Sequence, residues 1–361
     1  MKKVLKLLGI LLLVLLLIVI GYAGYVFGTY SRIEDNQNLS VTHGCSGVQT
    51  AEPETPYKIL SWNIGFGAYE ADFGFFMDGG TQSRAWSKER LLDNLDEIGT
   101  LLAAQDADLT LLQEVDFDSD RSYHVDEALT LRTFDGLDVY TDSVFAVNYH
   151  SAYLFYPLTK PHGASNSGLL TISKLGVKSA VRRSLPVETG VTKLLDLDRC
   201  YSVSRIPVSN GKELCLFDLH LSAYTSDGKI ADEQLELLLS DMQREYEAGN
   251  YVVGGGDFNK DLLEGGSEAY FGVLTEDHTW AQPIRFDLLA ATDIRLVAPE
   301  GKGAPVPSVR NADGPYHDGQ LVLTVDGFLV SPNVEVLESE VLDTGFANSD
   351  HNPVVMTVEL S

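Results

Sequence analysis

Apolar and polar positions along the chain predict a membrane anchor followed by one α/β domain. Residues 7–31 contain no charged side chain, and at about 1.5 Å per helical residue their apolar part reaches roughly the 30 Å thickness of a bilayer's hydrocarbon core. The residues that follow are polar and show no periodic apolar pattern, which is typical of a tether. We therefore expect a transmembrane anchor at residues 7–29, a tether at residues 30–56 and one folded domain at residues 57–361.

Charged and aromatic residues beside the apolar run predict its orientation. Three lysines lie within residues 1–6 and little positive charge follows the run, so the positive-inside rule keeps residues 1–6 in the cytoplasm and places the domain outside. Tyr22, Tyr25 and Tyr30 resemble the aromatic belt of a membrane interface. A cleaved signal peptide is the alternative, but its apolar region usually spans only about 7 to 15 residues. We expect a single-pass protein of the cell membrane whose domain is extracellular.

Strand and helix periodicities alternate along the domain. Ser87 can cap a helix whose large apolar residues then fall on one face. The elements we expect, in chain order, are a strand at 58–64, a helix after Ser87, strands at 109–112 and 213–221, a helix at 230–247, and strands at 251–253, 321–331 and 353–360. This alternation predicts an α/β domain, in which polar residues at the strand ends collect in one site. Glu114, His220 and Asp257 all fall at such ends.

Residues 65–86 interrupt the alternation with glycines and aromatic residues that follow no clear period. The aromatic residues of this segment are Phe66, Phe73, Phe75, Phe76 and Trp86. Two interpretations are open. The segment is either a lip that contacts substrate or membrane, or a surface loop that its own aromatic residues hold together.

Two carboxylates are suited to a magnesium site. Hydrolysis of a phosphate ester needs a cation that spreads the charge developing on the phosphoryl oxygens. Mg²⁺ prefers oxygen ligands, and proteins often supply only one or two carboxylates. Glu114 and Asp350 meet that need, with Asn63 as a neutral support.

A second group of residues is suited to handling water and protons. Asp257 and Asn259 alternate, so in an extended segment both side chains point the same way, toward one substrate. The carboxylate can orient water while the amide donates to a phosphoryl oxygen. His351 can act as acid or base near neutral pH, provided that a carboxylate such as Asp326 fixes its tautomer.

The ordered series of these motifs is more specific than any one of them, and residues 57–361 resemble the endonuclease/exonuclease/phosphatase superfamily. The motifs that carry the resemblance are, in order, Leu60-Ser61-Trp62-Asn63, Leu112-Gln113-Glu114-Val115, Asp218-Leu219-His220-Leu221, Gly255-Gly256-Asp257-Phe258-Asn259, Val325-Asp326-Gly327-Phe328 and Ser349-Asp350-His351-Asn352-Pro353. The resemblance implies a four-layer sandwich of two packed mixed β-sheets flanked by helices. It also implies a metal-dependent phosphoric ester hydrolase, either a phosphodiesterase or a phosphatase.

The resemblance also implies roles for individual residues. Glu114 would be the principal ligand of Mg²⁺, with Mn²⁺ as an alternative, and Asn63 would support the metal site. Asp350 would belong both to the metal site and to the network of the adjacent histidine.

On the phosphate side, Asp257 would orient or activate water, Asn259 would bind the phosphoryl group and His220 would contact the phosphate. Asp326 would orient His351. Members differ in the residue assigned as the base, so His351 and Asp257 are joint candidates.

Three further residues are candidates for binding substrate. Arg121 follows the metal glutamate and either binds a second phosphate oxygen or forms an exposed ion pair with its acidic neighbours. Tyr149 and His150 belong to a polar cluster between apolar stretches. The chain departs from the superfamily pattern at Asp218-Leu219, where Asn-Thr is usual, and at Gly327, where an aromatic residue is usual. Both departures lie where substrate groups are read, so no named member's substrate transfers to this chain.

Charge narrows the substrate class. The formal net charge of −26 repels polyanions at long range. We therefore expect hydrolysis of a lipid or small-molecule phosphoester, which an apolar lip near the site would favour. The alternatives are an extracellular metal-dependent nuclease, which a basic cleft would favour, and a non-catalytic binding module on the same fold. Every acid, amide and histidine position is filled, which weakens the last of these.

Overall fold

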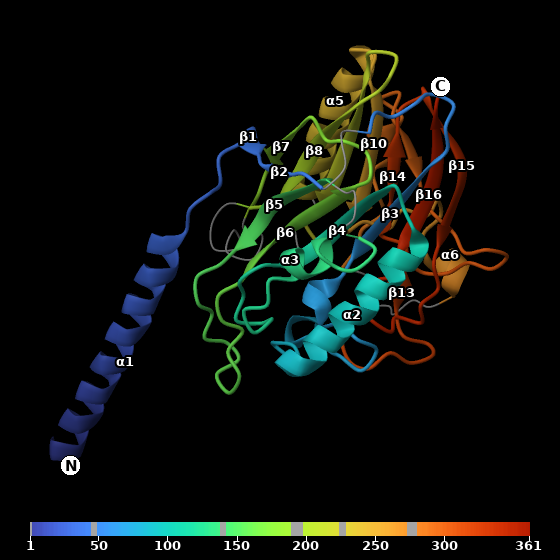
Figure 1. Ribbon diagram of the computed structural model, residues 1–361. Coiled ribbons are helices and arrows are strands. Elements are labelled where there is room, and N and C mark those ends of the chain that lie inside the picture. Colours follow the sequence, from blue (N-terminus) through green and yellow to red (C-terminus); the bar gives the residue numbers. More distant parts are fainter. Residues whose placement is uncertain (1, 45–48, 138–141, 189–197, 224–228, 273–279) are drawn as a thin grey trace.

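The computed structural model describes residues 2–44, 49–137, 142–188, 198–223, 229–272 and 280–361. The helix α1 (Lys2–Thr29) extends away from the rest of the molecule (Figure 1), and none of its residues is buried. Within the described ranges it is the one helix that is long and apolar enough to cross a membrane. The apolar segment predicted at residues 7–29 is thus one continuous helix.

The remainder of the described chain is built around two large sheets. The strands of the first sheet are, in chain order, β1 (Gln37–Leu39), β7 (Ser179–Ser184), β8 (Cys200–Pro207), β9 (Glu213–His220), β10 (Tyr251–Asp257), β11 (Arg295–Val297) and β14 (Asp326–Val330). They lie side by side in the order β1-β7-β8-β9-β10-β14-β11. Strands β9 and β10 pair in parallel and the other neighbours pair antiparallel, so the sheet is mixed.

The second sheet is also mixed. Its strands are β2 (Val41–Thr42), β3 (Tyr57–Asn63), β4 (Leu109–Asp116), β5 (Asp142–His150), β6 (Asn166–Ser173), β15 (Val334–Val341) and β16 (Val354–Leu360). Their order is β15-β16-β3-β4-β6-β5-β2, with β3 and β4 parallel. A small separate ladder joins β12 (Val309–Arg310) to β13 (Val322–Leu323).

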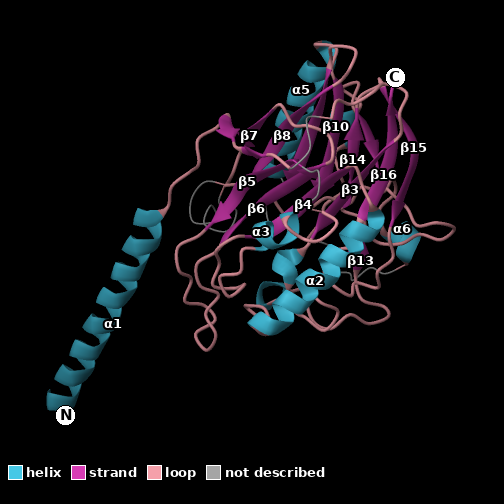
Figure 2. Ribbon diagram, in the orientation of Figure 1, coloured by secondary structure: helices cyan, strands magenta, loops and turns pink. Residues whose placement is uncertain are grey.

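Helices cover the outer faces of both sheets, as Figure 2 shows. The helices are α2 (Lys88–Gln105), α3 (Glu127–Arg132), α5 (Lys229–Glu247), α6 (Glu268–Phe271) and α7 (Phe286–Leu289), together with the 3-10 turns η1 (Gly65–Gly67) and η2 (Phe76–Asp78). As expected, Ser87 caps α2, because its side chain accepts a hydrogen bond from the backbone N–H of Arg90.

Three layers of apolar side chains hold the four layers of secondary structure together. Between the sheets lie Ile59, Leu111, Leu216, Val253 and Phe328. The buried face of α2 packs on the outer side of the second sheet, and that of α5 packs on the outer side of the first. The predicted four-layer sandwich of two mixed sheets flanked by helices is confirmed.

Strand alternation explains why polar residues converge at one edge of the sandwich. In each strand every second side chain faces the space between the sheets. Following β10 from Val253 on that face leads to Asp257, and following β9 from Leu216 leads to His220. By the same alternation Asn63 and Asp326 lie on the inward faces of β3 and β14. The apolar middle of each strand therefore fixes where its polar end points.

The structure corrects the expectation that residues 30–56 are only a tether. Two short strands in this segment, β1 and β2, add one edge strand to each large sheet, and Ala51 is fully buried. These strands have two or three residues each, which is too short for a period to be recognised in the sequence. The structure also contains β15, a strand that the sequence analysis did not predict; its outward side chains are largely charged or polar.

Asp218 forms a buried polar contact between the two sheets. Its two carboxylate oxygens accept hydrogen bonds from Gln113 Nε2 (2.9 Å) and Thr171 Oγ1 (3.1 Å) on the second sheet. Burial raises the pKa of Asp218 to about 8, although both hydrogen bonds lower it. The folded state therefore retains a proton that the unfolded state releases between the ordinary carboxyl pKa and about pH 8.

We expect Asp218→Asn to stabilise the protein increasingly as pH rises through this window. Asp218 contributes stability that is fully present below the pKa of the unfolded state and is lost as pH rises through its folded-state pKa. The amide cannot ionise, so the difference in unfolding free energy should grow by at most about 1.4 kcal/mol per pH unit, then level off above about pH 8. Denaturant unfolding of both proteins at several pH values measures this difference. A difference that does not depend on pH would contradict the prediction.

Candidate active site

A cavity of about 180 Å³ opens at the edge where the polar strand ends meet. Its walls include most of the predicted site residues, namely Glu114, Arg121, Tyr149, His220, Asp257, Asn259, Asp350 and His351. Asn63 and Asp326 lie behind this wall, where Asn63 is hydrogen-bonded to Glu114 and Asp257, and Asp326 to His351. The sequence motifs of six distant segments are thus assembled at one place.

Glu114 reaches the cavity through a break in strand β4. The sequence analysis ended this strand at residue 112 and placed Glu114 just beyond it, but the strand continues to Asp116 with a register shift between Leu112 and Val115. Glu114 has a positive φ of 55° within that irregularity. A bulge of this kind re-aims a side chain without ending the strand. The carboxylate therefore faces the cavity from the middle of a well-anchored strand.

Asn63 links two carboxylates of the site. Its side-chain N–H group donates to Glu114 Oε1 (3.3 Å) and to Asp257 Oδ2 (3.0 Å). Its amide oxygen accepts from the backbone N–H of Gly65 (3.0 Å), which determines the orientation of the amide. In this geometry Asn63 orients the carboxylates, and its oxygen is turned away from them.

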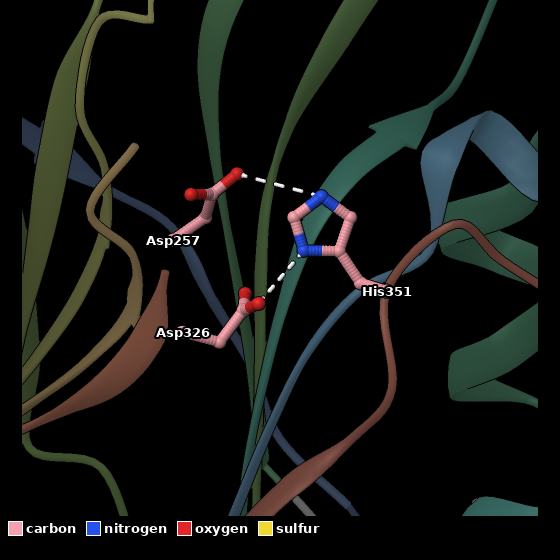
Figure 3. Close-up of side chains that lie close together, drawn as sticks. All are labelled: Asp257, Asp326 and His351. Atoms are coloured by element: carbon pink, nitrogen blue, oxygen red, sulfur yellow. Dashed lines mark hydrogen bonds and ion pairs between the residues drawn. The ribbon is translucent and has the colours of Figure 1, made fainter. Parts of the chain in front are cut away.

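Asp326, His351 and Asp257 form a connected acid–imidazole–acid group (Figure 3). His351 Nδ1 lies 2.8 Å from Asp326 Oδ2, and His351 Nε2 lies 3.9 Å from Asp257 Oδ2. Ser308 Oγ donates to the same Asp326 oxygen (2.7 Å) and so holds that carboxylate in place. The first hydrogen bond fixes the orientation of the imidazole and directs Nε2 toward Asp257.

Burial and charge shift the pKa values of this group in opposite directions. Burial disfavours the imidazolium, but the charge and hydrogen bond of Asp326, helped by Asp350 and Asp257, raise the pKa of His351 to about 10. Burial raises the pKa of Asp257 to about 7, with His351 opposing and Asp326 assisting. Asp326 therefore favours the cationic form of His351, and burial favours the protonated form of Asp257.

His220 and Asn259 line the cavity beside Asp257. His220 Nε2 lies 3.4 Å from Asp257 Oδ2, and burial, followed by the charges of Arg199 and His351, lowers the pKa of His220 well below its ordinary value. Its imidazole is therefore neutral and can donate one hydrogen bond. Asn259 is held by its own backbone N–H, which donates to Asp257 Oδ1 (2.8 Å), and by its side-chain N–H, which donates to the carbonyl of Leu221 (2.8 Å).

The donor set at one side of the cavity fits a magnesium ion. Glu114 and Asp350 both line it. Burial raises the pKa of Asp350 to about 6; the charges of His351 and Arg310 lower it, and the negative charge of Glu114 raises it. A divalent cation beside these two carboxylates would offset the repulsion by which Glu114 raises the pKa of Asp350. Separately, Asp257, Asp326 and His351 place ligand atoms within 4.8 Å of one another, so a buried acidic and histidine group able to hold a metal also exists.

The three candidate substrate-binding residues differ in their placement. Arg121 is buried and forms an ion pair with Asp116 through Nη2 (2.8 Å) and Nε (3.0 Å), so the expectation of an exposed ion pair is wrong. Its guanidinium also lies 4.0 Å above the ring of Phe66 and lines the cavity together with Tyr149.

His150 is not among the cavity-lining residues in the described part of the chain. Its Nδ1 lies 2.8 Å from Asp198 Oδ2. We therefore assign His150 to the structural contact with Asp198.

Two cavity residues escaped the sequence analysis as functional candidates. Arg310 is buried, lies in a loop-rich region and carries no motif; its Nη2 donates to the carbonyls of Glu70 (3.1 Å) and Phe73 (3.2 Å), which holds residues 65–86 against the site. Asn148 is also buried, and within the described structure its Nδ2 has no hydrogen-bond partner. In the sequence, the position of Asn148 beside Tyr149 in a polar cluster was the one feature that could have indicated a functional role.

The aromatic segment at residues 65–86 matches both interpretations in different parts. Phe66, Phe73 and Phe75 are buried in the core beneath α2, as expected of a loop that its own aromatic residues hold together. Phe76 and Met77 line the cavity, and Met77 is exposed. The first part of the segment is therefore structural, and its η2 turn forms an apolar lip at the cavity mouth.

The chain belongs to the endonuclease/exonuclease/phosphatase family, whose family model matches residues 60–351. Members of this family are phosphoester hydrolases. No curated protein matches the chain.

Solved structures share the fold. An endonuclease/exonuclease/phosphatase from Beutenbergia cavernae is 19% identical with a TM-score of 0.60, covering 85% of this chain and 72% of that one. ANGEL2, a 2′,3′-cyclic phosphatase solved with adenosine-2′,3′-vanadate, is 14% identical with a TM-score of 0.55, covering 89% and 98%. The human Nocturnin catalytic domain with a bound sulfate anion is 15% identical with a TM-score of 0.51, covering 90% and 97%.

Proposed function

We propose that this protein is a membrane-anchored, Mg²⁺-dependent phosphoester hydrolase that acts outside the cytoplasm on a lipid or small-molecule phosphoester. The observation that carries the proposal is the convergence of Glu114, Asp350, Asp257 and His351 on one cavity. Family membership supports hydrolysis as the reaction class. The exposed apolar helix with lysines on its N-terminal side supports the anchor, its orientation and an extracellular domain.

The residues of the cavity divide the chemical work. Glu114 and Asp350 would hold Mg²⁺, which supplies charge stabilisation to the phosphoryl oxygens when bound. Asp257, whose pKa is raised by burial, is suited to orient water and take its proton. His351, kept cationic by Asp326, is suited to stabilise the negative charge that develops on the substrate. This division favours Asp257 over His351 as the base.

The phosphoryl group would be bound by donors from four segments of the chain. His220 is neutral and lies beside Asp257. Arg121 lines the same cavity, as does Asn148, whose Nδ2 has no hydrogen-bond partner among the described residues. Asn259 lines the same cavity and is held by hydrogen bonds to Asp257 and Leu221. A cavity of about 180 Å³ with an apolar lip is suited to one phosphoester group.

A comparison of substrates tests this choice of class. We expect duplex DNA to be cut poorly relative to the best phospholipid, nucleotide or sugar phosphate, because a domain of this negative charge binds successive phosphates weakly. The specificity constants should be compared at about 0.15 M salt, where screening no longer exaggerates surface charge. If DNA is the best substrate, the protein is the extracellular nuclease instead. If no phosphoester is hydrolysed, the binding-module alternative replaces both.

A further inference from the structure

A loop between β5 and β6 exposes large apolar side chains at its tip. Phe155 is 52% exposed, Tyr156 69% and Leu158 84%. Residues 151–162 also contain no Asp or Glu, in a chain that has 52 acidic residues. Single exposed apolar residues are ordinary, but several together on a loop without carboxylates indicate a surface that meets an apolar partner. We refer to residues 153–158 as the apolar loop.

The apolar loop touches the outer end of α1. Tyr22 Oη donates to the carbonyl of Tyr153 (3.1 Å) and accepts from the backbone N–H of Phe155 (3.4 Å). The rings of Tyr22 and Phe155 meet edge to face with centroids 5.3 Å apart, and the backbone N–H of Tyr153 donates to Tyr25 Oη (3.3 Å). The loop therefore lies at the level of the tyrosines at the end of the helix, on the side of the domain that faces α1 (Figure 1).

The apolar loop also continues into the lip of the active-site cavity. The rings of Tyr156 and Phe76 are 5.7 Å apart, and Leu154, Phe76 and Met77 all line the cavity. The backbone just beyond the loop is held by Arg84, which donates to the carbonyl of Pro161. A continuous apolar surface thus runs from the end of the anchor, over the loop, to the cavity mouth.

We propose that the apolar loop docks into the outer leaflet of the bilayer that holds α1, so that the cavity opens on the membrane surface and takes its phosphoester from lipid head groups. The partner is identified by continuity: the loop contacts the anchor at its aromatic end, where the bilayer interface lies if α1 spans it. The exposed Phe155 and Leu158, the loop's own Tyr153 and Tyr156, and the absence of carboxylates from residues 151–162 all suit that interface. The inference deepens the proposed function and rests on it.

Lipid contact can be measured without reference to activity. The full chain carrying Tyr156→Trp is reconstituted in phosphatidylcholine vesicles whose acyl chains are brominated near the head group, and its fluorescence is compared with that of the parent chain. We expect the bromolipid to remove most of the fluorescence added at position 156. The matched control is Leu337→Trp on β15, an exposed apolar position (45%) across the sandwich from α1, which should not be quenched.

Equal quenching at positions 156 and 337 would overturn the proposal. A second copy of the chain that covers position 156 would also overturn the proposal. In that case the fluorescence would change with the density of protein in the vesicles and would not respond to bromination of the lipid.

Activity assays then test whether docking of the apolar loop gives the active site access to lipid substrate. A triple variant, Phe155→Ser with Tyr156→Ser and Leu158→Ser, should hydrolyse phospholipid in bilayers about tenfold more slowly or worse, because three apolar contacts with the membrane are lost. The triple variant should hydrolyse soluble bis(p-nitrophenyl) phosphate as fast as the unmodified chain does. The control variant Leu129→Ser should do the same. Equal loss on both substrates would overturn the proposal. If the unmodified chain hydrolyses neither substrate, the proposed function fails, while quenching still decides whether the loop docks.

Discussion

Replacing Glu114 by glutamine should lower the turnover of a phosphodiester by two to four orders of magnitude and weaken Mg²⁺ binding at the same time. The substitution keeps the shape of the side chain and its contact with Asn63 but removes one of two carboxylates that face the cavity. Charge stabilisation by a bound metal is worth several kcal/mol in a transition state, and each 1.4 kcal/mol is about tenfold in rate.

The Glu114→Gln experiment has two readouts. Calorimetric titration with Mg²⁺ measures affinity, and hydrolysis of bis(p-nitrophenyl) phosphate measures turnover. Glu335→Gln, an exposed position on β15, is the matched control and should change neither. Unchanged Mg²⁺ affinity in Glu114→Gln would remove this residue from the metal site, whatever happened to the rate.

His351→Ala should lower kcat by about a hundredfold to ten-thousandfold, the usual contribution of a positioned acid or base. The imidazole is buried, bonded to Asp326 at 2.8 Å and directed toward Asp257, so its loss removes the cationic group nearest the water-handling carboxylate. Asp326→Asn should show a smaller loss in kcat, because the imidazole stays in place but loses the charge that keeps it protonated.

Steady-state kinetics with a soluble phosphodiester checks both variants. His317→Ala, which alters a histidine bonded to the carbonyl of Asp318 and absent from the described cavity lining, is the control. All three variants should unfold cooperatively in denaturant. Activity of His351→Ala within a few-fold of the unmodified chain would exclude His351 from the chemistry, and an Asp326→Asn loss exceeding that of His351→Ala would mean that Asp326 acts by itself.

The fold was predictable from the sequence where long elements repeat a period. The face of α2 and the central strands β3, β9 and β10 follow from apolar alternation, because each is buried against a neighbouring layer. Short edge strands such as β1 and β2 were missed, since their pairing depends on the finished sheet and not on their own residues. The strand β15 was missed because half of its side chains are polar or charged, and a register shift between Val336 and Glu338 interrupts its alternation.

The site was predictable as a set of motifs but not as a geometry. The convergence of Asp257 and His220 follows from the lengths of two parallel strands. The bulge that turns Glu114 toward the cavity has no signal in the sequence, because it depends on the register with β6. Arg310 was missed for a similar reason: its Nη2 donates to the backbone carbonyls of Glu70 and Phe73, which lie far away in sequence. The orientation of Asn63, with its oxygen on Gly65, likewise required the folded structure.

The metal dependence of hydrolysis tests the central claim most directly. The full chain in detergent is freed of divalent cations with EDTA, assayed on bis(p-nitrophenyl) phosphate and phospholipid, and then supplied with Mg²⁺, Mn²⁺ or Ca²⁺ in excess. We predict that EDTA abolishes turnover on every substrate and that Mg²⁺ or Mn²⁺ restores it, because Glu114 and Asp350 are oxygen ligands suited to these ions. Full activity in EDTA would contradict the assignment of the cavity as a metal-dependent phosphoesterase site.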